Sequence, residues 1–266
     1  MIDVGAYLDR IGCNGAATLG AVHRAHVTSI PFENLDPWSG RPVSLALVDV
    51  ERKLVSDRQG GYCFEHNLLL QAVLQQLGHE VEPLLARART GGWPGPIRPR
   101  THLVLRVRAD DQTWLADVGF GFGGCLDPLP CRVGGPYSQS GWRFRIVSDD
   151  PELVVQAARG EEWSDLYGVT LSPVPLIDVE TANWMTSTYP GSPFVRGPVI
   201  SATAADGQRT LLRSDAEHEF VLVEQHPDRR VTTPLRRSEL PAILERRFGL
   251  DPTRVPTADQ ATPRPV

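Results

Sequence analysis

A cysteine in the first third of the chain is placed where a nucleophile could form. Cys63 follows Gly60 and Gly61 and begins a stretch, residues 63–77, in which apolar side chains recur at helical spacing. A cysteine in the first turn of a helix lies among unpaired backbone N–H groups and at the positive end of the helix dipole, and both favour the thiolate. The same N–H groups could hold a developing oxyanion. Cys63 is therefore the candidate nucleophile; the alternative is a small buried packing residue.

A histidine and an aspartate that could serve this thiol lie on a predicted β-hairpin. Alternating residues predict strands at 102–107 and 113–118, with a turn-like segment between them. If the loop has an even number of residues, His102 lies opposite or diagonal to Asp117 on one face of the sheet. If the number is odd, the two side chains lie on opposite faces. On one face, Asp117 could fix the tautomer of His102 and stabilise its imidazolium. Taken singly, His102 could instead be an edge-strand residue and Asp117 a turn cap.

A second histidine competes for the role of the base. His66 follows Cys63 by three residues and so lies on the same helix face. It has no evident carboxylate to orient it. We therefore rank His66 behind His102 and expect it to be a packing or substrate-facing residue.

A glycine-rich segment follows the aspartate. Residues 118–124 read VGFGFGG, without the lysine and Ser/Thr of a Walker loop and without the G-x-G-x-x-G spacing that opens a helix. These absences exclude an ATP or dinucleotide fingerprint. Two interpretations stay open, which are close approach of the backbone to a ligand and a tight corner in a barrel.

The composition excludes several functions. A net charge of -5 without a basic stripe argues against a nucleic-acid partner. The first twelve residues contain no apolar run, and no stretch approaches the roughly 20 apolar residues of a membrane span, so we expect neither a signal peptide nor a membrane partner. The four cysteines form no C-x-x-C pair, so we expect no disulfide and no metal site, in a cytoplasmic setting.

The periodicity places these residues in an order of helices followed by strands. Helices are predicted at 6–11, 16–27, 48–56 and 63–77, and strands at 81–88, 102–107, 113–118, 142–147 and 153–156. Residues 157–198 show only weak periodicity and are expected to form a long connection. A last unit is predicted from strands at 198–203, 209–213 and 220–224 and a helix at 237–248, before a loose, proline-rich tail at 252–266.

Six short motifs in this order resemble those of the arylamine N-acetyltransferases. The histidine and aspartate motifs are Thr101-His102 and Asp117 to Gly121, and the cysteine motif is RQGGYCFE at 58–65. The others are YLDRIG at 7–12, IPFENL at 30–35 and SPF at 192–194. The resemblance covers most of the chain.

The resemblance implies an α+β fold with a cysteine-protease-like core. Its parts would be an N-terminal helical bundle with the nucleophile at 1–79, a central β-barrel with His and Asp at 80–190, a C-terminal α/β lid at 191–251 and a flexible tail at 252–266. It also implies that Glu33 and Asn34 belong to a buried polar network.

The implied activity is transfer of an acetyl group from acetyl-coenzyme A to an aromatic amine or hydrazine. Cys63, His102 and Asp117 would be the catalytic triad of a ping-pong reaction through an acetyl-cysteine. Thr101, Phe120 and Gly121 would lie near the pantetheine or acyl group. Acetyl-coenzyme A would be a cosubstrate, with no tightly bound cofactor. The alternatives are an amide synthase and a transglutaminase-like or papain-like amide hydrolase with the same triad.

Two departures from the family pattern bear on these expectations. Gln59 stands where the family usually has arginine, so either Arg58 replaces its contacts or the buried network is weaker. Residues 122–131 diverge after the aspartate motif, which leaves coenzyme A contacts there and the acyl-chain preference open. The acceptor amine and the oligomeric state are also open at this point.

Overall fold

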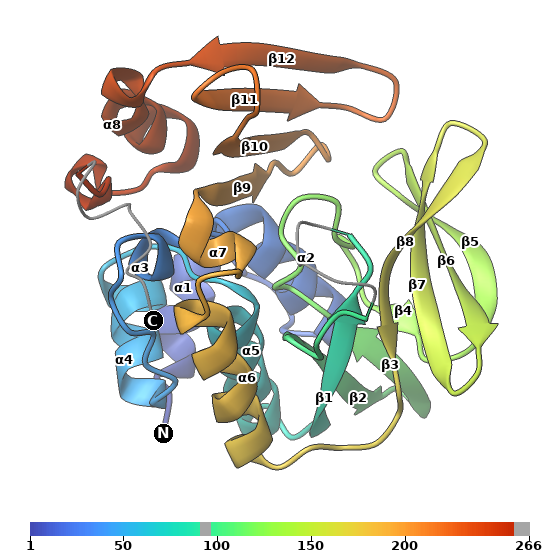
Figure 1. Ribbon diagram of the computed structural model, residues 1–266. Coiled ribbons are helices and arrows are strands. Elements are labelled where there is room, and N and C mark those ends of the chain that lie inside the picture. Colours follow the sequence, from blue (N-terminus) through green and yellow to red (C-terminus); the bar gives the residue numbers. More distant parts are fainter. Residues whose placement is uncertain (91–96, 258–266) are drawn as a thin grey trace.

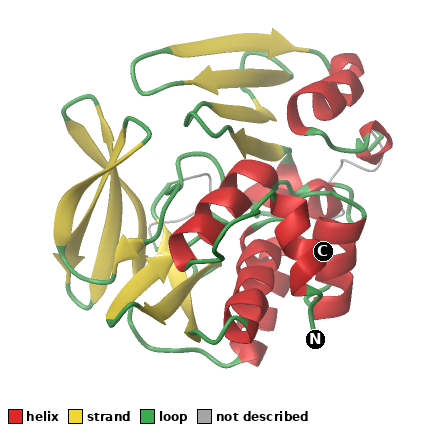
Figure 2. Cartoon of the chain, turned by 180° about the vertical axis from the view of Figure 1, so that it is seen from behind, coloured by secondary structure: helices red, strands yellow, loops and turns green. Residues whose placement is uncertain are grey.

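The computed structural model describes residues 1–90 and 97–257. Figures 1 and 2 show three groups of elements: helices from the first part of the chain, a strongly curved sheet beside them, and a smaller sheet with short helices above both. The order is that of an α+β fold with an N-terminal helical bundle, a barrel-like sheet and a C-terminal α/β lid, as the sequence predicted.

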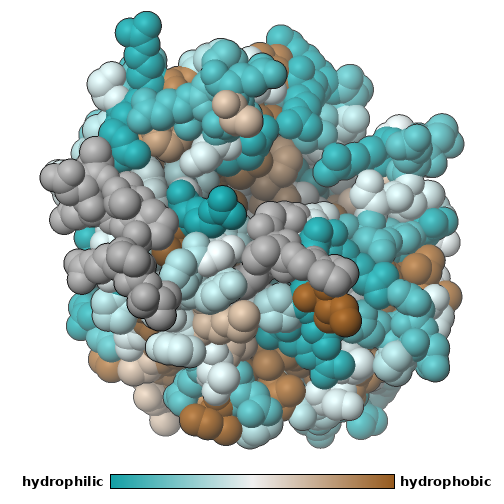
Figure 3. Space-filling view, in the orientation of Figure 1, coloured by the Kyte–Doolittle hydropathy of each residue, from teal (hydrophilic) through white to brown (hydrophobic). Residues whose placement is uncertain are grey.

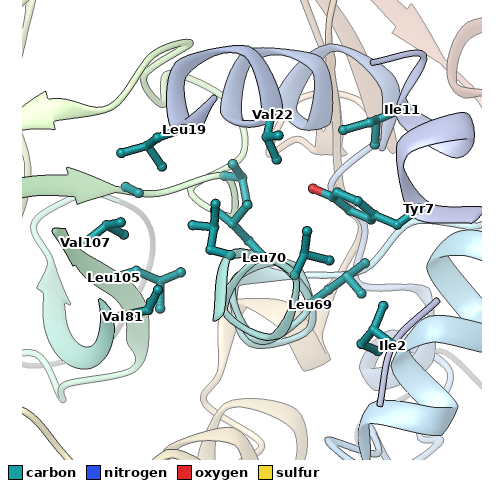
Figure 4. Close-up of a cluster of buried hydrophobic side chains, with 14 of the residues drawn as sticks. Ile2, Tyr7, Ile11, Leu19, Val22, Leu69, Leu70, Val81, Leu105 and Val107 are labelled. Atoms are coloured by element: carbon teal, nitrogen blue, oxygen red, sulfur yellow. The ribbon is translucent and has the colours of Figure 1, made fainter. Parts of the chain in front are cut away.

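The helical group surrounds one central helix. It consists of α1 (Val4–Ile11), α2 (Leu19–Ser29), α3 (Leu35–Trp38), α4 (Leu47–Glu51), which continues as a wider turn over Arg52–Ser56, and α5 (Cys63–Gln76). Ten of the 14 residues of α5 are buried, because other elements pack on nearly every side of it. Figure 4 shows Leu69 and Leu70 of α5 between Tyr7 and Val22 of the first two helices and Leu105 of the sheet. A nucleophile at the start of this helix is therefore held by the main core.

The curved sheet has eight antiparallel strands in the order β4-β3-β2-β1-β8-β7-β6-β5 and is nearly closed. The strands are β1 (Glu80–Ala88), β2 (His102–Ala109), β3 (Gln112–Ala116), β4 (Leu129–Pro130), β5 (Gly134–Gln139), β6 (Trp142–Asp149), β7 (Glu152–Arg159) and β8 (Glu162–Val169). The chain enters at β1, adds three strands on one side and then returns through the other four to pair β8 with β1.

The β2–β3 hairpin has the even loop on which the triad prediction depended. Asp110 and Asp111 form its two-residue loop with φ values of 51° and 55°, which is typical of a type I′ turn. Ala109 pairs with Gln112 and Leu105 with Ala116, so the numbers of paired residues sum to an odd value. Strand β3 ends at Ala116, and Asp117 therefore lies one residue beyond it, diagonal to His102.

The smaller sheet forms the upper part of the molecule in Figure 1. It contains β9 (Val199–Thr203), β10 (Arg209–Ser214), β11 (Phe220–Gln225) and β12 (Arg230–Leu235), and short helical turns over 237–248 include α8 (Leu240–Ile243). β12 was not predicted, because five of its six residues are exposed and it contains a proline, as an edge strand can.

The expectation of a long connection at 157–198 is wrong. The segment contains β8, a 13-residue helix α6 (Leu176–Thr188) and α7 (Pro193–Arg196). α6 buries Asn183, Thr186 and Ser187 beside Val179 and Ala182 and exposes Trp184, so its apolar residues are not confined to its buried face. The helical periodicity of hydrophobic residues is consequently absent from the sequence.

The predicted loose tail is also wrong at its start. Pro252–Arg254 form a 3-10 turn, and the Arg254 guanidinium forms ion pairs with Glu33 and Asp36 from the helical group. This contact fixes the C-terminal part of the described chain to the helices. The rest of the predicted tail, 258–266, lies outside the described residues.

The face shown in Figure 3 is largely hydrophilic, with apolar residues in small scattered groups. Within the described ranges, each helix is too short or too polar to cross a membrane.

Candidate active site

Cys63 is the first residue of α5, and its side chain is buried, with 3% of the residue exposed. Its Sγ lies 3.6 Å from the carbonyl oxygen of Thr101, which precedes β2. On its other side, a Cβ atom on Gly119 would lie 2.7 Å from the Cα atom of Cys63. Close approach of the backbone therefore requires glycine at this position of the glycine-rich turn.

His102 and Asp117 form a buried pair beside this cysteine. The Nε2 atom of His102 lies 2.7 Å from Oδ2 of Asp117. Burial by itself would lower the pKa of His102, but the Asp117 charge, its hydrogen bond and the neighbouring Cys63 sulfur outweigh it and raise that pKa to about 10. Burial would raise the pKa of Asp117, and the contact with His102 lowers it instead. The structure thus brings the three predicted residues together, with Nδ1 of His102 left for the sulfur.

Two residues that the sequence analysis missed hold Asp117 in place. Asn67 donates from Nδ2 to Oδ1 of Asp117 at 3.0 Å and accepts from the Val118 N–H at 3.1 Å. The Nε2 atom of His23 accepts from the N–H of Asp117 at 3.1 Å, and its Nδ1 faces the Leu126 carbonyl at 2.9 Å. Asn67 follows Cys63 by four residues, so helical spacing could have indicated it. His23 carried no comparable signal.

Aromatic rings enclose the imidazole of His102. Its ring centre lies 5.3 Å from that of Phe120 and 5.0 Å from that of Tyr167 on β8. Both rings limit access of water to the His102–Asp117 pair. Tyr167 was not predicted, because it follows His102 by 65 residues, in a segment expected to be a connection.

His66 follows Cys63 by one helical turn on α5 but has different partners from His102. Its Nδ1 atom is 2.7 Å from Nε2 of His26, whose Nδ1 is 2.8 Å from the Tyr7 hydroxyl. Its Nε2 atom faces the carbonyl oxygens of Gly61 and Pro31 at 3.0 and 3.3 Å. Burial lowers the pKa of His66 to about 4. His66 is fully buried and does not line the cleft, so the alternative of a substrate-facing residue is wrong.

The buried polar network around Glu33 is present, and within the described residues the Arg58 side chain forms no hydrogen bond or ion pair in it. Lys53, the one lysine of the chain, lies 2.7 Å from Glu65 and 3.4 Å from Glu33. Arg254 adds an ion pair of 2.9 Å to Glu33. Gln59 accepts a hydrogen bond from Arg254 at 3.3 Å. The cations of this network are thus Lys53 and Arg254.

Asn34 bonds to a separate set of partners, the backbone of residues 194–199. It is fully buried, donates from Nδ2 to the Phe194 and Gly197 carbonyls at 2.7 and 2.8 Å, and accepts from the Val199 N–H at 2.7 Å. These bonds join the helical group to the start of β9. One side of the cleft is therefore fixed relative to α5.

A cleft of about 660 Å³ lies between the curved sheet and the smaller sheet, and Cys63 and His102 line it. Thr101 and Phe120, which the resemblance places near the acyl donor, also line the cleft. Gly121 does not: it has a φ of 76° and packs its backbone against the ring of Phe32, beside a smaller hollow. In the described part of the chain, no group of three His, Cys, Asp or Glu residues could hold a metal ion.

The chain is similar to known enzymes over most of its length. The N-acetyltransferase family profile matches residues 16–255. The arylamine N-acetyltransferase of Mycolicibacterium smegmatis is 41% identical over 222 residues, which are 79% of this chain and 80% of that protein. The enzyme of that name from Mycobacterium tuberculosis is 37% identical over 223 residues, covering 80% and 79% of the two chains.

A solved structure shares the fold. The arylamine N-acetyltransferase of Mycobacterium marinum in complex with CoA superposes with a TM-score of 0.88 and 32% identity, covering 97% of each chain. The fold, the extent of the match and the level of identity together lead to one conclusion: the chain belongs to the arylamine N-acetyltransferase family.

Proposed function

We propose that this protein transfers an acetyl group from acetyl-coenzyme A to aromatic amines and hydrazines through an acetyl-cysteine at Cys63. The observation that carries the proposal is the contact of a buried His102–Asp117 pair with a cysteine at the start of a helix, on the wall of a large cleft. The names of the similar enzymes support the choice of acceptor.

The first half-reaction forms the acetyl-enzyme. Asp117 favours the imidazolium form of His102, and this cation stabilises the thiolate of Cys63. The thiolate attacks the thioester carbonyl, and the bond between that carbon and the coenzyme A sulfur breaks. The leaving sulfur takes the proton of the His102 imidazolium, and coenzyme A departs as the thiol.

The second half-reaction regenerates the cysteine. His102 is now neutral and can accept a proton from an amine that attacks the acetyl carbon. The bond to Sγ breaks, and Cys63 returns as the thiolate beside the imidazolium. Because coenzyme A leaves before the amine reacts, this order of steps predicts ping-pong kinetics.

The cleft offers suitable groups for acetyl-coenzyme A. Thr101 and Phe120 lie beside the catalytic residues, where the acyl and pantetheine groups would bind. Arginine is suited to phosphates because its guanidinium can form two parallel hydrogen bonds, and the cleft is lined by four arginines: Arg159, Arg196, Arg209 and Arg213. The M. marinum relative that binds CoA supports the same assignment.

Two further parts of the proposal concern the chain as a whole. We propose the domains 1–79, 80–190 and 191–251, with the turn at Pro252–Arg254 held against the first of them. We also place the enzyme in the cytoplasm, because a thiol nucleophile must remain reduced and all four cysteines are free.

Initial-rate kinetics with acetyl-coenzyme A and 4-methylaniline test the function. Parallel double-reciprocal lines, and loss of turnover in Cys63→Ser with unchanged melting, are expected. Intersecting lines would contradict the acetyl-enzyme. Acylation of Cys63 by peptides but not by acetyl-coenzyme A would favour the amide hydrolase, and turnover restricted to another acyl-coenzyme A would favour an amide synthase.

A further inference from the structure

Arg209 is a buried cation whose hydrogen-bonding capacity is largely unused. It begins β10, lines the cleft and is 3% exposed. Its Nη2 donates to the Gly124 carbonyl at 2.8 Å. Its Nε is buried and, among the described residues, has no hydrogen-bond partner. No carboxylate within residues 1–90 and 97–257 forms an ion pair with it.

Other arginines of low exposure have hydrogen bonds or ion pairs to several partners. Arg10 donates to the carbonyls of Leu54 and Ser29 at 3.0 and 2.9 Å, and Arg254 contacts the carboxylates of Glu33 and Asp36. A buried charge is costly unless it is paired or fully hydrogen bonded. Arg209 stands apart from these arginines because it is on the wall of the substrate cleft.

The guanidinium is held by an aromatic ring. Its Cζ atom lies 3.8 Å from the ring centre of Trp142 on β6, and the indole N–H of Trp142 donates to the Gly207 carbonyl at 2.8 Å. The charge is therefore fixed where the curved sheet meets the smaller sheet. A fixed, incompletely bonded guanidinium in a cleft is suited to two-point binding of an oxyanion.

We propose that Arg209 binds an oxyanion of a substrate, either a phosphate of the acyl donor or a carboxylate of the acceptor. The proposal rests on the proposed function, since it assigns the ligand to the two substrates of that reaction. Both groups present the two oxygens that a guanidinium binds in parallel. Substrates with and without each anion distinguish the two sources.

The test compares kcat/KM of Arg209→Gln with that of the wild type for two donors and two acceptors. The donors are acetyl-coenzyme A and S-acetylpantetheine, which lacks phosphates, and the acceptors are 4-aminobenzoate and 4-methylaniline, which lacks the carboxylate. The control is Arg145→Gln, since Arg145 also stacks on a tryptophan, Trp163, at 4.3 Å but does not line the cleft.

A selective loss for one anionic substrate is the expected result. A fall of about tenfold to a hundredfold with acetyl-coenzyme A but not with S-acetylpantetheine assigns the phosphate, and the same contrast between the acceptors assigns the carboxylate. Equal changes with and without the anion overturn the proposal and leave Arg209 a structural link. If Arg209→Gln does not fold, Arg209→Lys serves, because it keeps the charge and loses the fork. Wild-type turnover tests the proposed function separately.

Discussion

Two buried histidines near the start of helix α5, His102 and His66, behave in opposite ways. His102 is almost fully buried beside Asp117, and its pKa is raised to about 10. His66 is fully buried beside His26 and two carbonyl oxygens, and burial lowers its pKa to about 4. Burial is nearly equal in the two places. The partner therefore decides which histidine carries a proton.

The contacts of His66 determine which atoms donate and which accept in the hydrogen bonds that join Tyr7, His26 and His66. The Nε2 atom of His66 faces two carbonyl oxygens, so it must carry the proton. Its Nδ1 then accepts from Nε2 of His26, and Nδ1 of His26 accepts from the Tyr7 hydroxyl. Every ring nitrogen of His66 and His26 forms a hydrogen bond with an uncharged group. A base needs both a free nitrogen and a carboxylate, and only the His102 side has them.

The change of Asp117 to asparagine breaks this contrast most strongly. Without the carboxylate, burial is no longer offset, so we expect the pKa of His102 to fall and the thiolate–imidazolium pair to be lost. Acetyl-enzyme formation in a single turnover should slow by roughly three to four orders of magnitude. Asparagine is similar in size, so the melting temperature should change little by comparison. A near wild-type rate would remove Asp117 from the triad.

Removal of the Asn67 side chain tests how far the His102–Asp117 pair depends on the hydrogen bond that Asn67 donates to Asp117. Asn67→Ala removes the bonds to Oδ1 of Asp117 and to the Val118 N–H, so the carboxylate should be less well oriented. We expect acetylation to slow by about tenfold to a hundredfold and stability to fall by about 1–3 kcal/mol, since the partners are buried. Stopped-flow acetylation and urea unfolding measure the two effects. Asn67→Asp, which lacks the amide donor, should not restore the rate.

The free energy of unfolding at acid pH reports on the protonation of His66. Between pH 6.5 and about 4 the unfolded chain protonates this histidine and the folded chain does not, so stability falls as pH falls through this window. The loss should be on the order of 3 kcal/mol. His66→Gln should make the pH dependence of urea unfolding shallower, with acetylation changed by less than about threefold. An unchanged slope would show that His66 is protonated in the folded state.

Tyr7→Phe should give the smallest effect. It removes one buried hydrogen bond, from the Tyr7 hydroxyl to Nδ1 of His26. Within the series Tyr7–His26–His66, this bond is the one farther from His66 and Cys63. We expect a loss of about 1 kcal/mol in thermal or urea unfolding and an unchanged rate of acetylation. A slowed acetylation step would instead connect this series to the chemistry.

The sequence predicted that Cys63, His102 and Asp117 lie together, because their placement depends on local rules. The position of Cys63 follows from a helix start, and the shared face of His102 and Asp117 follows from the parity of one hairpin loop. Asn67 was missed although its spacing was readable. Tyr167 and Arg209 could not be predicted, because their positions depend on contacts between distant parts of the chain. Tyr167 reaches His102 through the pairing of β8 with β1. Arg209 of the smaller sheet lies against Trp142 of the curved sheet and lines the cleft.

The fold was predicted where hydrophobic periodicity was regular. It was missed in α6, whose buried positions include hydroxyl and amide groups bonded to backbone carbonyls, such as Thr186 and Asn183. The shared contact of Lys53 and Arg254 with Glu33 and Asp36 was likewise not predictable, since 201 positions separate the two cations in the sequence.

The most direct test is to mix the protein with acetyl-coenzyme A in the absence of an amine and locate the acetyl group by peptide mass spectrometry. The account predicts one acetyl group on Cys63, formed at the rate of coenzyme A release and removed when 4-methylaniline is added. Cys13→Ala should behave as the wild type, and Cys63→Ser should remain unmodified. An acetyl group on another residue, or full turnover by Cys63→Ser, would contradict the central claim.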